Sequence, residues 1–243
     1  GAVANNAFGF YKERLTHQHH QDRGIAMDFA LARRNMVESQ LRTNKVTGTK
    51  LLQALHRIPR ERFVPNAKRH LAYFDESIEV AKNRWLMPPM PLARLIQESY
   101  PQDTDNVMVI GAGMGYSSAL YGALARSVFA VENDPDLVEE MGGALTDLAL
   151  DNVVAVEASL ADGYPKEGPY DIILMTGMIE YAPQALLDQL SEGGRLMAVV
   201  GAPGDIGRAT LFGKKNGMTS TRVLFDATIK PLPGFARTPA FVF

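Results

Sequence analysis

The chain has 243 residues, enough for one large domain with an added element but short for two full domains. It is 46% hydrophobic and 21% charged, with a formal net charge of -2, so nothing in its charge indicates a nucleic-acid or membrane partner. It has no cysteine, which excludes disulfides, thiolate metal sites and a cysteine nucleophile, and no apolar run or signal-like segment suited to a membrane, so we expect a cytoplasmic protein.

Residues 1–26 are predicted to be a polar N-terminal extension, because they show no steady apolar period. The extension contains HQHHQ at His17–Gln21, which places three of the five histidines within four residues. Neither an acidic residue nor another histidine completes a ligand set at a suitable spacing, so we expect a solvated segment and no metal site. Gly1 is not a natural start, and Met27 is a plausible initiator.

Residues 27–100 are predicted to form a helical cap followed by a substrate-loop region. Apolar residues recur at helical spacing at Phe29, Met36, Val37 and Leu41, and again at Leu51, Leu52, Leu55 and Ile58. Pro59 ends the second helix. The stretch from Asn66 to Met90 has mixed polarity, and a loop of that length inside a compact domain is usually functional. A further helix is expected after Pro91.

Residues 101–243 are predicted to form the ligand-binding domain, because strand and helix patterns alternate there. The expected strands are Val107–Ile110, Val128–Glu132, Val153–Val156, Asp171–Thr176 and Arg195–Val200, and the expected helices are Tyr116–Ala125, Pro135–Ala149 and Pro183–Leu190. Runs such as VMVI and IILM are apolar throughout, as in strands buried on both faces. Asn216-Gly217, between two β-rich runs, predicts a terminal hairpin. The fold class is therefore α/β: a doubly wound, mostly parallel seven-stranded sheet with a C-terminal antiparallel hairpin and an N-terminal helical cap.

The sequence VMVIGAGMGYSSAL at Val107–Leu120 is the most informative motif. Its glycines, Gly111, Gly113 and Gly115, follow a buried strand and precede a helix. Glycines at this position let the backbone approach a ligand at the carboxyl edge of the sheet, where such folds bind. A tight turn without a ligand is the alternative interpretation.

The spacing of the motif discriminates between cofactors. Dinucleotide sites use G-x-G-x-x-G, whereas position 116 is Tyr. Glu132 ends the next strand, 21 residues after Gly111, where a carboxylate can accept hydrogen bonds from both ribose hydroxyls of a nucleoside, unless it is simply a solvated strand end. Asn133 is expected to border the adenosine. The pattern favours S-adenosylmethionine, with S-adenosylhomocysteine as product, over NAD.

Taken together, several motifs resemble the protein-L-isoaspartate O-methyltransferase family, from Met36 to about Pro233. They are MVESQLRTNKVTGTKLLQALHRIPRERFVP, AYFDE at Ala72–Glu76, the glycine motif, YDIILMT and LLDQLSEGGRLMAVVG. The resemblance implies a Rossmann-like methyltransferase that transfers a methyl group to the carboxylate of an altered aspartyl residue in a protein or peptide. A carboxylate is already ionised at pH 7, so this chemistry needs no general base.

Two segments depart from the family's pattern. Where the family has G-x-T-I-S-x-P, with the serine at the reaction centre, Trp85, Leu86, Met87 and Pro89 fall where Thr, Ile, Ser and Pro would. After the third strand, Ala158, Ser159 and Leu160 replace G-D-G, and the resemblance places Ser159 and Leu160 at the adenine edge. Asp162 is the nearest acid in sequence.

The sequence assigns no catalytic residue. Asp75 and Met87 border the expected transfer point, without a defined role. Three functions stay open: a methyltransferase of the isoaspartyl-repair type, a relative with another acceptor that could be a small molecule, and a non-catalytic binding protein. NAD binding is a distant fourth. The sequence does not specify the oligomeric state.

Overall fold

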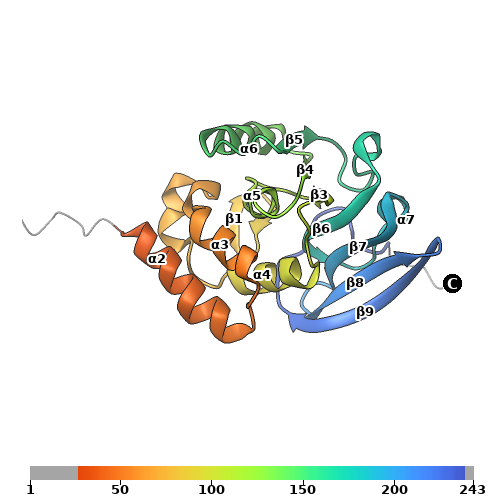
Figure 1. Cartoon of the computed structure of the whole chain (residues 1–243), viewed down its shortest axis with the longest axis horizontal. Helices are drawn as coiled ribbons and strands as arrows, with labels where there is room; N and C mark the ends of the chain where they lie inside the picture. The colour runs from red at the N-terminus through yellow and green to blue at the C-terminus, as the bar shows by residue number, and fades with distance from the viewer. Residues whose placement is uncertain (1–26, 239–243) are drawn as a thin grey trace, which may run out of the picture.

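The computed structural model describes residues 27–238, and the histidine-rich segment His17–Gln21 lies outside them. Its centre is a seven-stranded sheet in the order β5-β4-β3-β6-β7-β8-β9 (Figure 1). The strands are β3 (Asn106–Ile110), β4 (Ser127–Glu132), β5 (Val153–Glu157), β6 (Tyr170–Ile179), β7 (Leu190–Val200), β8 (Gly207–Lys215) and β9 (Met218–Ala227). Strands β3 to β7 pair in parallel, whereas β8 and β9 are antiparallel, which confirms the predicted fold class.

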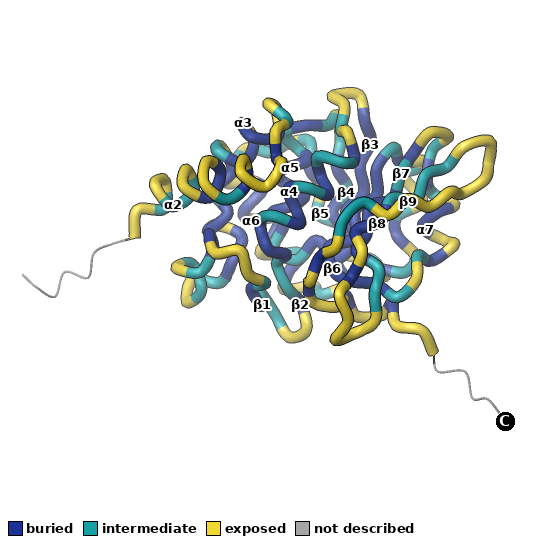
Figure 2. Tube along the Cα trace, turned by 90° about the horizontal axis from the view of Figure 1, so that it is seen from below, coloured by how far each residue is buried: buried dark blue, intermediate teal, exposed yellow. Residues whose placement is uncertain are grey.

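Helices cover both faces of this sheet. They are α4 (Pro89–Glu98), α5 (Tyr116–Gly122), α6 (Pro135–Asp147) and the short α7 (Gln184–Asp188). Alternation along β3 explains the layers: Val107 and Val109 join the core that contains α4, α5 and α6, and Met108 and Ile110 join the core beneath α7. Figure 2 shows the central strands buried, as their unbroken apolar sequences predict.

Residues 29–71 are largely helical, as predicted for the cap. The helices are α2 (Phe29–Asn35), which continues through the π-helical η1 (Met36–Leu41) and the 3-10 turn η2 (Arg42–Asn44), then α3 (Thr49–Arg57), η3 (Arg60–Phe63) and η4 (Asn66–Leu71). Asp28 caps α2 by accepting a hydrogen bond from the Leu31 amide at 3.0 Å. Buried cap residues such as Leu41 and Leu55 belong to the same apolar cluster as Val107 of the central sheet, so the cap and the sheet share one core.

The stretch Asn66–Met90 is more structured than the expected loop. After η4 it forms a separate antiparallel hairpin, β1 (Ile78–Ala81) and β2 (Arg84–Leu86), and α4 starts at Pro89 instead of after Pro91. The Lys82-Asn83 turn is not a strong hairpin signal, but Asn83 adopts a left-handed conformation, with φ of 59°, that asparagine tolerates. This hairpin lies beside the glycine turn and therefore bears directly on the site.

The terminal hairpin forms around Asn216-Gly217, as predicted. Both residues have positive φ, 52° and 71°, which is the conformation of a two-residue type I′ turn. Strand β7 begins earlier than predicted, at Leu190, because the Gly193-Gly194 turn is absorbed as an irregularity in its pairing with β6.

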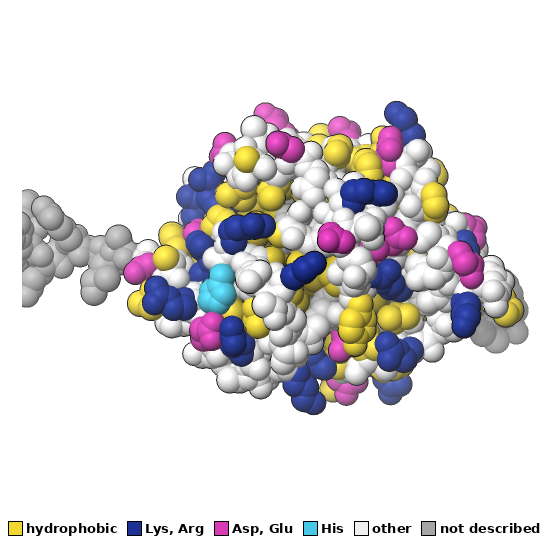
Figure 3. Space-filling view, viewed as in Figure 1, with side chains coloured by type: hydrophobic (Ala, Val, Ile, Leu, Met, Phe, Trp, Pro, Cys, Tyr) yellow, Lys and Arg dark blue, Asp and Glu magenta, His cyan; other side chains and the backbone are white. Residues whose placement is uncertain are grey.

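Basic and acidic side chains are interspersed over the face in Figure 3, in keeping with the small net charge. Among residues 27–238, the helices are too short or too polar to cross a lipid bilayer.

Candidate functional site

The glycine turn lies at the carboxyl end of β3, between β4 and β6. Gly111, Gly113 and Gly115 all have positive φ, of 77°, 58° and 101°, so an L side chain would be strained at each position. Helix α5 begins at Tyr116, directly after the turn. The local structure is therefore the strand, glycine turn and helix that the motif predicts.

Glu132 ends β4 beside this turn and is fully buried, with 0% exposure. Its Oε2 accepts a hydrogen bond from the Gly113 amide at 2.9 Å, and its Oε1 accepts from the Asn133 amide at 2.8 Å. Backbone donors thus fix the carboxylate beside the glycine turn. A buried carboxylate held in this way is a ready acceptor for neutral or cationic donors.

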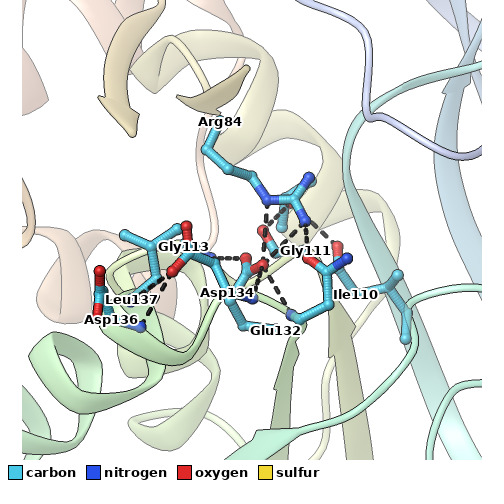
Figure 4. A network of polar contacts seen from close by, with 10 residues as sticks. Arg84, Ile110, Gly111, Gly113, Glu132, Asp134, Asp136 and Leu137 are labelled. Atoms are coloured by element: carbon cyan, nitrogen blue, oxygen red, sulfur yellow. Dashed lines mark hydrogen bonds and ion pairs between the residues drawn. The ribbon is translucent and has the colours of Figure 1, made fainter. Parts of the chain in front are cut away.

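A side chain that the sequence does not assign to the site also donates to Glu132. Arg84, from β2, donates from Nε and Nη2 to Glu132 Oε1 at 3.1 and 2.9 Å, and also from Nη2 to Asn133 Oδ1 at 2.5 Å. Figure 4 shows Arg84 reaching from the hairpin onto Glu132. Only 8% of the Arg84 side chain is exposed, and its Nη1 is buried without a hydrogen-bond partner among the described residues. Arg84 therefore makes the contact that was predicted for a ribose.

Side chains of the protein itself cover the glycines. A Cβ on Gly111 would lie 2.6 Å from Leu232 Cδ1, and one on Gly115 would lie 2.8 Å from Met141 Cγ. A Cβ on Gly113 would meet Val80 of the hairpin at 3.7 Å. At position 115, glycine is required by the positive φ and by the close approach of Met141 of α6. Gly111 and Gly113 instead border the crevice above the turn.

The crevice itself is small. Its volume is about 20 Å³, and its lining includes Gly111, Gly113, Val80, Trp85 and Thr176. Small-molecule sites usually occupy roughly 300 to 1,000 Å³, so a nucleoside needs more room than this conformation provides.

A much larger cleft of about 900 Å³ adjoins the crevice, between η3 and η4 on one side and α6 on the other. Val80 and Met114 line both spaces. The hairpin that carries Val80 is therefore part of the wall between the crevice and the open cleft.

The predicted adenine-edge residues have different surroundings. Ser159 is exposed, whereas Leu160 is 4% exposed and belongs to the core beneath α7. Asn133 lies next to Glu132 and accepts from Arg84. Asp162 is exposed, and its backbone carbonyl accepts from Gln189 Nε2 at 2.8 Å. Contacts of these residues with an adenine stay predictions.

Met87, which replaces the family's serine in the resemblance, is buried and lines the crevice. Arg60 holds its backbone: Nη2 donates to the Met87 carbonyl and Nε donates to the Ala72 carbonyl, both at 2.6 Å. The guanidinium lies over the Tyr116 ring, 4.9 Å from its centroid. Burial lowers the pKa of Arg60 and raises the pKa of Tyr116 to about 12.

Asp75 is exposed, and its Oδ1 accepts from the Met90 amide at 2.9 Å.

Sequence reasoning missed Arg84 and Leu232 as parts of the site. Leu232 reaches Gly111 because the segment after β9 returns along β6, where the Met178 amide donates to the Lys230 carbonyl at 2.9 Å. Lys230 also lies over Trp85, with Nζ 5.0 Å from the ring centroid. The only signal for Arg84 in the sequence is that Arg84–Leu86 lies in a segment that departs from the family's pattern. This departure does not indicate which residue Arg84 contacts.

The fold and the glycine turn with its buried carboxylate define an α/β protein of the Rossmann-like methyltransferase class. Residues 32–232 match the family described as Protein-L-isoaspartate(D-aspartate) O-methyltransferase (PCMT). The chain belongs to this family, and the predicted resemblance is confirmed.

Similar proteins agree with this assignment. The chain is 35% identical to a protein-L-isoaspartate O-methyltransferase of Methanoculleus marisnigri, over 83% of this chain and 91% of the relative. It is 32% identical to the enzyme of the same name from Koribacter versatilis, over 85% and 92%. A solved protein-L-isoaspartate O-methyltransferase superposes with a TM-score of 0.73 at 23% identity, over 83% of this chain and 66% of the other. A putative one from Plasmodium falciparum, solved in complex with S-adenosyl-L-homocysteine, superposes with a TM-score of 0.69 at 18% identity, over 85% and 99%.

Proposed function

We propose that this protein is an S-adenosylmethionine-dependent methyltransferase that acts on the carboxylates of altered aspartyl residues in proteins or peptides. The observation that carries the proposal is the position of Glu132, a buried carboxylate fixed by the Gly113 amide at the end of β4. Membership of the family supports the same activity. A cytoplasmic location and the absence of nucleic-acid and membrane partners stay predictions from composition.

The residues at the carboxyl end of the sheet suit such a cofactor in chemistry, although the crevice must widen. Gly111 and Gly113 would offer bare backbone, Glu132 would accept from the ribose hydroxyls, and Asn133, Ser159 and Leu160 would border the adenosine. The bound cofactor supplies an electrophilic methyl group. We propose residues 101–243 as the cofactor-binding domain. Residues 27–100 would contribute the surface that binds the methyl acceptor.

The protein's own contribution is positioning and exclusion of water. An acceptor carboxylate is the nucleophile at neutral pH, so no side chain has to remove a proton. Trp85, Leu86 and Met87 place apolar surface on the crevice, and this surface would desolvate the attacking carboxylate and hold it in line. Loss of a serine hydroxyl bonded to a charged group costs about 1.5 to 3 kcal/mol, which reduces a rate without abolishing it.

The test is incubation with an isoaspartyl peptide and methyl-labelled cofactor. The proposal expects a base-labile methyl ester on the peptide and none on the matching aspartyl peptide. Absence of ester at high enzyme concentration would remove the isoaspartyl assignment.

The apolar lining around Met87 favours a second candidate, a methyltransferase with a different acceptor. Restoring the family's loop, with Met87→Ser and Trp85→Thr, separates the two. It should raise isoaspartyl activity if the first candidate holds and lower the true activity if the second does. A non-catalytic binding protein is the third candidate, and calorimetry that detects no cofactor binding would support it.

A further inference from the structure

We propose that Arg84 determines cofactor affinity: its guanidinium occupies the ribose position on Glu132, and the cofactor enters only when the β1–β2 hairpin moves away. The inference rests on the proposed function. In the present conformation Arg84 blocks the cofactor site at the glycine turn. Cofactor entry and rearrangement of the surface expected to bind the methyl acceptor would therefore occur together.

Among the described residues, Arg84 is the one side chain that donates to Glu132. Oε1 receives both Nε and Nη2 of Arg84, together with the Asn133 and Asp134 amides, while Oε2 is held by Gly113. Among the described residues, every donor except Arg84 is a backbone amide, either of the glycine turn (Gly113) or of the segment that follows β4 (Asn133 and Asp134). Arg84 is therefore the donor that can leave without a change in the backbone, and its departure would leave Oε1 with the two amides alone.

Hydrogen bonds compensate the burial of the Arg84 guanidinium only in part. The side chain is 8% exposed, yet Nη1 has no partner in the described part of the chain. A buried ion pair has a large desolvation cost, which its mutual attraction repays fully only when the remaining polar groups are satisfied. A ligand that supplies neutral hydroxyl donors and releases Arg84 to water can therefore compete for Glu132.

The β1–β2 hairpin is separate from the seven-stranded sheet. Strands β1 and β2 form their own two-stranded sheet and make no ladder with the seven-stranded sheet. Isolated two-stranded hairpins are marginally stable in water. Besides Arg84, the hairpin's polar ties include Lys68 Nζ donating to the Glu79 carbonyl at 2.7 Å and the Lys230 ammonium over Trp85. These polar contacts are partly exposed. Ile78 of β1 belongs to the apolar core and Val80 and Leu86 pack against it, so the proposed movement changes these apolar contacts as well.

Movement of the hairpin would create space beside the glycine turn. Val80 of β1 and Met114 of the glycine turn both line the crevice of about 20 Å³ and the cleft of about 900 Å³. Displacement of the hairpin would remove Val80 from between the two spaces and leave Met114. The same displacement moves Trp85 and Leu86, which line the crevice beside Met87. Filling the cofactor site thereby reshapes the surface where the acceptor is expected.

Trp85 makes the movement observable, since it is the only tryptophan in the sequence. We therefore propose titration of the full chain with S-adenosylhomocysteine, followed by calorimetry and by tryptophan emission. The proteins compared are wild type, Arg84→Gln and Arg84→Lys. Lys82→Gln is the matched control, because it removes a positive charge from the exposed turn of the same hairpin.

The expected result is that the emission of wild-type Trp85 changes on binding and that Arg84→Gln binds at least about tenfold more tightly, since a larger fraction is open beforehand. The emission of unliganded Arg84→Gln should already resemble that of the liganded wild type. Arg84→Lys should fall between, and Lys82→Gln should match wild type. If Arg84→Gln is poorly folded, the comparison of Arg84→Lys with wild type tests the inference: tighter binding by Arg84→Lys supports it, and equal or weaker binding contradicts it.

Two other outcomes overturn the inference in distinguishable ways. If wild type binds but the Arg84 variants bind equally or more weakly, Arg84 does not compete with the cofactor, and the proposed function stands. If none of the four proteins binds, the proposed function fails and this inference fails with it.

Discussion

Arg60 donates a hydrogen bond to the backbone carbonyl of Met87 at 2.6 Å, from a side chain that is fully buried. The second bond of Arg60, to the Ala72 carbonyl, ties the segment before the hairpin to the segment after it. The interior guanidinium therefore fixes both ends of the region that contains β1 and β2. The hairpin can move while its two attachment points stay in place.

Replacement of Arg60 should destabilise the protein substantially. Arg60→Met leaves two buried carbonyls without donors, and charge-assisted bonds of this kind contribute about 1.5 to 3 kcal/mol each, so we expect a loss of about 3 kcal/mol. Urea unfolding measures it. Arg57→Met, at an exposed position on α3, is the control and should change stability by less than about 0.5 kcal/mol. Equal stability of the two variants would contradict the role given to Arg60.

Two buried tyrosines on α5 should respond in opposite ways to loss of their hydroxyls. The Tyr116 hydroxyl makes no hydrogen bond of normal geometry among residues 27–238 and has the Arg60 guanidinium as a polar neighbour, whereas the Tyr121 hydroxyl lies 2.9 Å from Ser99 Oγ. Removing an unpaired buried hydroxyl is neutral or stabilising, and removing a bonded one costs about 1 kcal/mol. We expect Tyr116→Phe to unfold at an equal or higher temperature than wild type and Tyr121→Phe at a lower one. The reverse order would show that Tyr116 is the bonded hydroxyl.

Two glycines should also respond in opposite ways to alanine. Gly115 has a φ of 101°, and a Cβ at this position would lie only 2.8 Å from Met141, so Gly115→Ala should cost about 2 kcal/mol or more through strain and overlap. Gly143 lies within α6 with open space around it, so Gly143→Ala should stabilise by about 0.5 to 1 kcal/mol. Thermal unfolding of both variants tests the pair.

The pH dependence of stability should include a contribution from Glu192. Hydrogen bonds from the Asn216 and Gly217 amides lower the pKa of this exposed carboxyl below its ordinary value. A lowered pKa in the folded state gives stability that is present above the unfolded pKa and lost as pH falls through the folded pKa. Glu192→Gln should therefore unfold at a lower temperature than wild type at pH 7, and the difference should close at acidic pH. A difference that is constant with pH would contradict this assignment.

Much of the fold could be predicted from sequence because its strongest signals are local. VMVI and IILM are apolar at every position, as expected for strands covered on both faces, and Asn216-Gly217 favours a turn with two positive φ angles. Gly113 and Glu132 were also assigned to one site from the rule that carboxyl ends of parallel strands share an edge.

The rest depended on contacts between distant residues. The Arg84–Glu132 pair joins positions 48 residues apart, and no periodicity links an arginine in a short hairpin to a carboxylate on another strand. Leu232 covers Gly111 only because the chain after β9 returns along β6. The β1–β2 hairpin itself was missed because Lys82-Asn83 lacks the glycine that usually marks such turns.

The most direct measurement is a crystal structure of the full chain with S-adenosylhomocysteine. We expect the ribose hydroxyls to lie on Glu132, with Arg84 withdrawn and the β1–β2 hairpin moved away from the glycine turn. A ligand found away from β3 and β4, with the Arg84–Glu132 ion pair intact, would contradict the central claim that this carboxylate is the cofactor's anchor.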